Sequence, residues 1–157
     1  MNEVVHITTV HPPFDARIFH KECRTLAKAG FHVTLIARHD RNEVVNGIHI
    51  RCLPGSKSRL TRIFGLSWRA FRQARREHAA IYHFHDPELL PIGILLKFLS
   101  GAKVIYDVHE DVPQQILTKH WIAAPLRSTI SWIFNVFEKQ IAHAIDGVVV
   151  ATEGIAE

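Results

Sequence analysis

The feature that most constrains the fold is an almost unbroken run of apolar and β-branched residues from Val4 to Val10. A strand with one face in water alternates between apolar and polar residues, whereas this run is typical of a strand buried on both faces. Such strands occur in parallel sheets that helices cover on both sides. The run therefore predicts an α/β protein.

Strand and helix patterns alternate along the rest of the chain. Helices are expected over 16–29, 58–78, 86–99 and 125–144, and further strands over 31–37, 48–53, 80–84, 103–108 and 147–152. Right-handed crossovers between successive strands then give a Rossmann-like parallel sheet of at least six strands, with helices on both faces. The strand over 48–53 alternates apolar and polar residues, which favours an edge position.

Two aspartates stand where helices are expected to begin. Asp15 precedes the helix over 16–29, and Asp86 precedes Pro87 at the start of the helix over 86–99. Aspartate is a preferred N-cap residue, and proline is tolerated at the first helical position because its missing N–H costs nothing there. We predict that both aspartates are N-caps.

Composition narrows the function classes. The 157 residues are 47% hydrophobic and 22% charged, which fits one domain with its own core. The net charge of +4 suits nucleic acid, an anionic membrane or phosphate groups, but no groove-reading motif supports nucleic acid as a partner. The two cysteines indicate no disulfide framework, and the N-terminus lacks a signal peptide, so we expect a cytoplasmic protein.

Residues 57–76 are strongly basic, and no acidic residue follows until Glu77. Trp68 and phenylalanines alternate with the basic positions at helical spacing. Such a helix could lie on an anionic membrane at the inner face of the cell membrane. We favour the other interpretation, a crossover helix with an apolar face on the sheet and a solvated basic face, because the fold needs a helix here.

In open parallel sheets, ligands bind beyond the carboxyl ends of the strands. The first strand is followed by no G-x-G-x-x-G, which argues against a dinucleotide-binding dehydrogenase. Imidazoles and carboxylates follow two later strands, over 83–87 and 107–111. A metal-dependent hydrolase using His83, His85 and His109 is one interpretation, but this ligand set is unspecific and His83 is expected to pack within the sheet. We therefore predict no metal.

Three segments resemble a known family: residues 11–19 (HPPFDARIF), 85–89 (HDPEL) and 106–110 (YDVHE). In this order they resemble the N-terminal domain of the family 4 retaining glycosyltransferases of GT-B architecture. The resemblance extends from the first strand to Thr152, and the ordered set is far more specific than any single motif.

The resemblance implies two Rossmann-like domains facing across a cleft, of which the first binds the acceptor and the second binds a nucleotide sugar. Residues 1–157 would be the acceptor-side domain, truncated and inactive alone, with the second domain absent from this sequence. The implied enzyme is a hexosyltransferase that uses a saccharide or lipid-linked acceptor, as in bacterial surface polysaccharide synthesis. It needs no metal cofactor, because basic residues and helix N-termini of the second domain neutralise the donor diphosphate.

The same resemblance implies site residues. His109 matches the histidine that reaches over the donor sugar and is the catalytic candidate. The substrate-binding candidates come from the loops after three of the predicted strands: Glu110, Asp111, Asp15, Arg17 and His85. Many relatives carry a glycine-rich loop after the first strand, where this chain has His11-Pro12-Pro13, so how the loop over 11–17 contacts the donor stays open. A rival class is a freestanding Rossmann-like module that binds phosphate or carbohydrate without chemistry.

Overall fold

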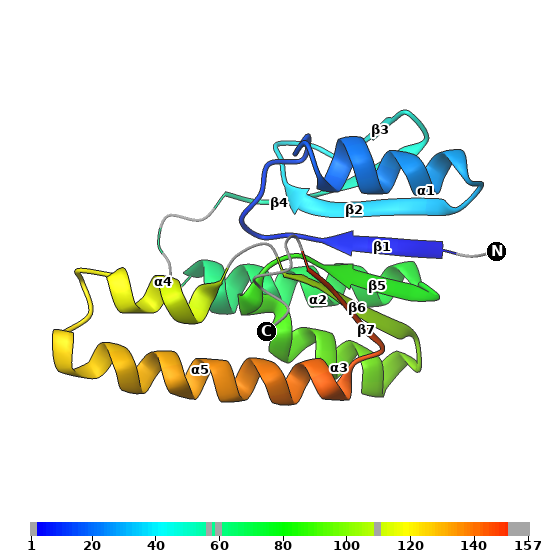
Figure 1. Ribbon diagram of the computed structural model, residues 1–157. Coiled ribbons are helices and arrows are strands. Elements are labelled where there is room, and N and C mark those ends of the chain that lie inside the picture. The colour runs from blue at the N-terminus through cyan, green and yellow to red at the C-terminus, as the bar shows by residue number, and fades with distance from the viewer. Residues whose placement is uncertain (1–2, 56–57, 59–60, 109–110, 151–157) are drawn as a thin grey trace.

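A seven-stranded sheet forms the centre of the protein, as seen in a computed structural model that describes residues 3–55, 58, 61–108 and 111–150 (Figure 1). Its strand order is β3-β4-β2-β1-β5-β6-β7. The strands are β1 (Glu3–Ile7), β2 (His32–Arg38), β3 (Glu43–Val45), β4 (Ile48–Leu53), β5 (Ile81–Phe84), β6 (Lys103–Val108) and β7 (Gly147–Val150). All neighbouring pairs are parallel except β3 and β4. The predicted Rossmann-like α/β fold is confirmed.

Helices cover both faces of this sheet, as predicted. A π-helical turn η1 (Ile18–Cys23) continues into α1 (Arg24–Lys28), and a second, η2 (Thr61–Leu66), continues into α2 (Ser67–Glu77). The 3₁₀ turn η3 (Pro87–Leu89) leads into α3 (Leu90–Ser100), and α4 (Val112–Thr118) and α5 (Ala124–Ala144) follow β6. Figure 1 shows α1 on one side of the sheet and α2, α3 and α5 on the other.

The two faces have separate cores, because successive strand residues point to opposite sides. On the side of α1, Phe19 and Cys23 pack with Leu35 and residues of β4. On the opposite side, Phe84 stacks on Tyr106 with ring centroids 4.9 Å apart, under α3. Gly93 lets α3 lie close against Phe84, since a Cβ at this position would meet the edge of the Phe84 ring, with Cζ only 2.9 Å away.

The structure corrects one strand assignment and adds two elements. The strand over 48–53 is not at the edge, because β3 pairs antiparallel with it and takes the edge position. Asn46 and Gly47 join the two strands with φ of 53° and 78°, the left-handed values of a tight hairpin. Both β3, which is only three residues long, and α4 were absent from the sequence prediction. No helix among the described residues is long and apolar enough to cross a bilayer.

Candidate functional site

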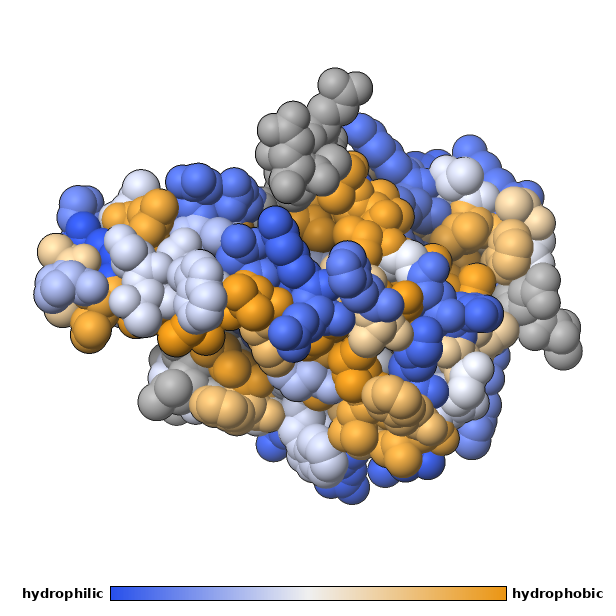
Figure 2. Space-filling model, turned by 60° about the horizontal axis from the view of Figure 1, so that its bottom comes forward, coloured by the Kyte–Doolittle hydropathy of each residue, from blue (hydrophilic) through white to orange (hydrophobic). Residues whose placement is uncertain are grey.

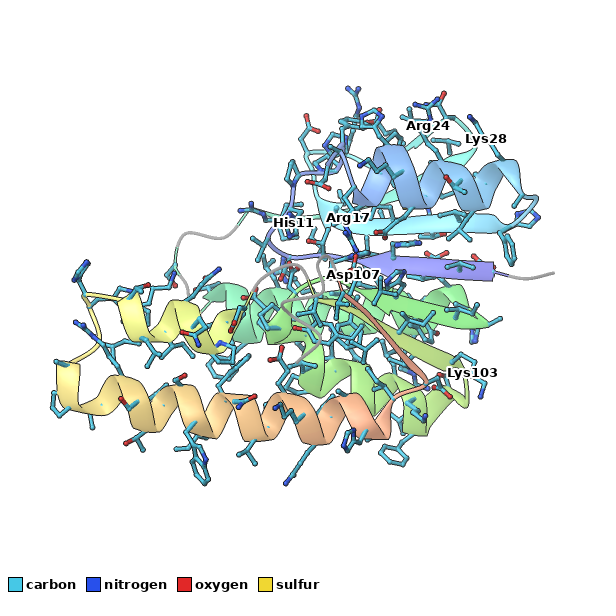
Figure 3. The ribbon with its side chains drawn as sticks, in the orientation of Figure 1. His11, Arg17, Arg24, Lys28, Lys103 and Asp107 are labelled. Atoms are coloured by element: carbon cyan, nitrogen blue, oxygen red, sulfur yellow. The ribbon has the colours of Figure 1, made fainter. Side chains whose placement is uncertain are left out.

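The carboxyl ends of β1, β5 and β6 bring together the segments that carry polar residues. These three strands are neighbours in the sheet, so the loops that follow them start side by side. Figure 3 shows His11, Arg17 and Asp107 near this edge, whereas Lys103 lies at the opposite end of β6. The candidate site is therefore built by loops far apart in the sequence.

Asp86 holds the loop after β1. Its Oδ2 accepts hydrogen bonds from the backbone N–H groups of Thr9 at 2.6 Å and Val10 at 3.2 Å, and from the hydroxyl of Thr8 at 2.9 Å. The aspartate occupies the predicted N-cap position, with Pro87 at the start of the helix, but its side chain makes no capping hydrogen bond. The prediction that Asp86 caps the helix is wrong in this respect, because the carboxylate is used by a neighbouring loop instead.

Asp15 caps the turn that leads into η1. Its Oδ1 accepts hydrogen bonds from the backbone N–H groups of Arg17 at 2.8 Å and Ile18 at 3.0 Å. The side chain therefore makes capping hydrogen bonds as predicted, but the helix begins at Ile18 rather than at residue 16, with Arg17 in the N-cap position. The cap also fixes the backbone of Arg17, from which the side chain reaches toward β6.

Arg17 forms a two-pronged ion pair with Asp107. Its Nη2 donates to Oδ1 at 2.7 Å and its Nε to Oδ2 at 3.0 Å, and Nε also lies 3.1 Å from Oε1 of Glu22. Asp107 is fully buried, and its hydrogen bonds raise the pKa of Arg17. Bidentate arginine–carboxylate pairs of this kind are directional and strong. The pair ties the first loop to the end of β6.

Three histidines lie beside this pair on the face of the sheet that carries α1. Nδ1 of His6 is 3.0 Å from Nε2 of His85, and the His83 ring centroid is 4.7 Å and 4.6 Å from those of His6 and His85. Burial lowers the pKa of His6, with a further contribution from His85. Burial, together with Asp107, raises the pKa of Glu22 to about 7. Burial therefore favours the neutral form of His6.

The first loop contributes three partly exposed polar side chains to this edge. The side chains of His11, Asp15 and Arg17 are 27%, 25% and 32% exposed, and Nε2 of His11 is 3.5 Å from Oδ1 of Asp86. A ligand at the carboxyl edge can reach these three groups. His11 was not among the predicted site residues, although the sequence already placed it directly after the first strand.

The predicted site residues take different positions. His109 and Glu110 lie outside the described residues. Asp111 caps α4 through a 2.9 Å hydrogen bond from the backbone N–H of Gln114 to its Oδ1. The side chain of His85 is fully buried, with Nδ1 3.3 Å from Oδ2 of Asp107. The catalytic role of His109 and the substrate-binding roles of the other residues stay predictions.

The fold is that of a Rossmann-like α/β domain with polar side chains at the carboxyl edge of its sheet. The model of the glycosyl transferase 4-like domain matches residues 16–157. The chain therefore belongs to the glycosyl transferase 4-like family, which confirms the resemblance identified from the three sequence segments.

A solved structure of sucrose-phosphate synthase from Thermosynechococcus elongatus has a similar fold, with a TM-score of 0.66 and 15% sequence identity. The similarity covers 94% of this chain and 42% of that protein, so the chain spans less than half of the synthase's length. At this identity the comparison shows the fold alone. The sequence matches no curated protein.

Proposed function

We propose that this chain is the acceptor-side domain of a two-domain glycosyltransferase that transfers a hexose from a nucleotide sugar to a saccharide or lipid-linked acceptor. The observation that supports this best is the family match over residues 16–157. The second, nucleotide-sugar-binding domain belongs to a longer protein in this proposal. Bacterial surface polysaccharide synthesis is the pathway type that the resemblance suggests, and the cytoplasm is the proposed compartment.

The arrangement at the carboxyl edge suits this role. Asp86 and the Arg17–Asp107 pair hold the first loop against β5 and β6, so the loop presents a defined surface to a partner domain. In the proposal Arg17, Asp15 and Asp111 contribute to the acceptor side with Glu110, and His85 supports them from the buried cluster. His109 hydrogen-bonds a hydroxyl of the donor sugar as positive charge develops on the sugar ring.

The transfer itself needs no metal in this proposal. Basic groups and helix N-termini of the second domain neutralise the diphosphate that leaves. The chain alone should therefore transfer no sugar. Formation of a glycoside from a nucleotide sugar by residues 1–157 alone would contradict the two-domain assignment.

The test of the site uses the longer protein that contains a second domain. His109→Ala should lower kcat by about a hundredfold, because it removes a hydrogen bond made as charge develops, while the thermal midpoint stays unchanged. His120→Ala is the matched control, since this exposed histidine lies between α4 and α5. Unchanged kinetics in a folded His109→Ala enzyme would remove His109 from the site.

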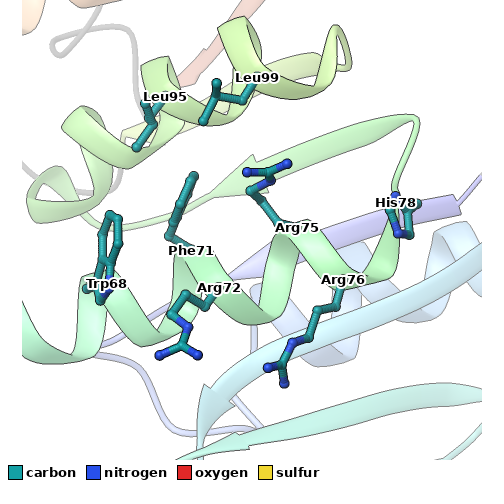
Figure 4. A pocket seen from close by; sticks show the side chains of 8 residues that line it. All are labelled: Trp68, Phe71, Arg72, Arg75, Arg76, His78, Leu95 and Leu99. Carbon is teal, nitrogen blue, oxygen red and sulfur yellow. The ribbon is translucent and has the colours of Figure 1, made fainter.

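We also propose that the basic segment 57–76 contacts an anionic membrane surface. On α2, Arg72 and Arg76 are exposed, and Trp68 is 52% exposed beside them. A groove of about 810 Å³ between α2 and α3 is lined by Trp68, Phe71, Arg72, Arg75, Arg76, His78, Leu95 and Leu99. In Figure 4 Trp68, Phe71 and Arg75 point toward α3, whereas Arg72 and Arg76 point away from it.

Neighbouring helices add apolar surface to the same side of the sheet. Phe98 of α3 is 77% exposed and Trp132 of α5 is 65% exposed. Figure 2 shows hydrophobic groups interleaved with hydrophilic ones on the face where α3 and α5 come forward. A combination of arginines with exposed aromatic residues fits an interface with anionic headgroups above acyl chains.

Vesicle binding tests this proposal with a charge-matched control. The double variant Arg72→Glu/Arg76→Glu should bind vesicles rich in anionic lipid about 30-fold or more weakly than the wild type, since each basic residue near such a surface contributes about 1 kcal/mol. Arg24→Glu/Lys28→Glu carries the same net charge change on α1, across the sheet (Figure 3). Equal weakening by both pairs, or binding indifferent to salt and lipid charge, would contradict a membrane role for α2.

A further inference from the structure

A cluster of four potential ligands lies beside the carboxyl-edge loops, and three of them have no part in the proposed transfer: His6, Glu22 and His83. His6 of β1, His83 of β5 and His85 after β5 face Glu22 of η1, and one donor atom of each lies within 4.8 Å of the others. We propose that these four side chains form a structural zinc site that fastens η1 to the sheet.

The distances among three of the four donor atoms are close to those of a tetrahedral ion. Nδ1 of His6 and Nε2 of His85 are 3.0 Å apart, and each lies 3.8 Å from Oε2 of Glu22. Zinc bonds of about 2.0–2.1 Å place neighbouring tetrahedral ligand atoms about 3.3 Å apart. Shifts of about half an ångström would bring the three atoms to that spacing.

The orientations of two ligands are already set by other partners. A carboxylate can only accept a hydrogen bond, so Nδ1 of His85 carries the proton that it shares with Asp107, and Nε2 of the same ring faces the cluster. A carboxylate behind a ligating histidine is the usual outer support of a metal site. Glu22 has its Oε1 turned to Arg17, so its Oε2 is directed at the histidines.

Within the part of the chain that the structure describes, two buried polar atoms of the cluster lack a hydrogen-bond partner, which indicates that a further binding partner belongs there. Oε2 of Glu22 and Nε2 of His6 are buried and have no hydrogen-bond partner among the described residues. Such atoms are uncommon in folded proteins, because leaving them unpaired costs free energy. An ion bound to Oε2 would remove one of these penalties.

The chemistry of the donor set selects the metal and its role. Three imidazoles and one carboxylate suit zinc, whereas magnesium and calcium prefer oxygen ligands. Four protein ligands leave no open position for water or substrate, which is the arrangement of structural sites. A cavity of about 460 Å³ borders the cluster and is lined by His6, Glu22, His83 and Lys21 among others.

The experiment uses the untagged 157-residue chain, stripped with a chelator and titrated with zinc, cobalt and magnesium. We expect one zinc per chain, a raised thermal midpoint with zinc but not with magnesium, and visible d–d bands of four-coordinate cobalt. Glu22→Gln keeps the size of the side chain and should weaken zinc binding by about 10-fold or more, as should Asp107→Asn.

Two controls keep the result interpretable. His49→Ala removes an exposed histidine of β4 far from the cluster and should leave zinc binding unchanged. His83→Gln serves as a second ligand variant if Glu22→Gln fails to fold. The proposal is overturned if the chain binds no zinc, if cobalt gives six-coordinate bands only, or if the folded ligand variants bind zinc as tightly as His49→Ala.

Discussion

Replacing Asp86 with alanine should destabilise the domain more than its position at a helix start would suggest. An N-cap aspartate replaced by alanine typically costs about 1 kcal/mol. Asp86 makes no capping hydrogen bond, however, and instead accepts two backbone N–H groups and a threonine hydroxyl from the loop after β1. The variant therefore leaves buried donors of another segment without their acceptor.

The magnitude follows from those donors. Each buried N–H left unpaired costs about 1–3 kcal/mol. Val10 N also lies 3.3 Å from the hydroxyl oxygen of Thr8, which partly compensates this N–H for the loss of the Asp86 carboxylate. For Thr9 N, no second acceptor is seen within the described structure. We expect Asp86→Ala to lower the free energy of unfolding by about 3 kcal/mol. Asp86→Asn keeps one oxygen in place and should cost about 1 kcal/mol through the lost charge.

Urea unfolding followed by circular dichroism measures these differences. With a slope of about 2 kcal/mol per molar urea, Asp86→Ala should lower the midpoint by about 1.5 M and Asp86→Asn by about 0.5 M. Asp40→Ala is the control, because the Asp40 side chain is 80% exposed. The reasoning fails if Asp86→Ala shifts the midpoint no further than Asp40→Ala, or if asparagine is as damaging as alanine.

Two further predictions concern packing and charge. Gly93→Ala should lower the free energy of unfolding by about 1–3 kcal/mol, because the new Cβ would meet the ring of Phe84. Gly65→Ala is the control in the same urea assay and should be neutral or stabilising, because the nearest atom to its Cβ would lie at 3.6 Å. Asp146 accepts from Lys97, Lys103 and the Val104 N–H, which hold its pKa well below the usual range. A depressed carboxyl pKa stabilises the fold above the unfolded value of about 3.9 and loses this effect as pH falls through the folded value. Asp146→Asn should therefore be less stable than wild type at pH near 7, with a gap that narrows toward pH of about 3, and a gap independent of pH would contradict this.

The sequence alone was sufficient for the features that depend on neighbouring residues. The apolar run from Val4 to Val10 indicated a doubly buried strand, although β1 ends at Ile7 and the last three residues of the run belong to the loop. Asp15 and Pro87 indicated two helix starts. These signals are local, since strand burial, turn conformation and the first helical turn involve residues within a few positions of one another. The alternation of such elements was enough to predict the parallel sheet.

The tertiary structure decided which polar side chains meet. Asp86 binds Thr9 from 77 positions away, Arg17 pairs with Asp107 across 90 positions, and His6 approaches His85 across 79. No spacing in a single sequence encodes these pairs, because they depend on β1, β5 and β6 being neighbours in the sheet. The strand pattern identifies the strands, but their order is set by how all the helices and strands pack together, and this order places the histidine cluster and the Arg17–Asp107 pair at one edge.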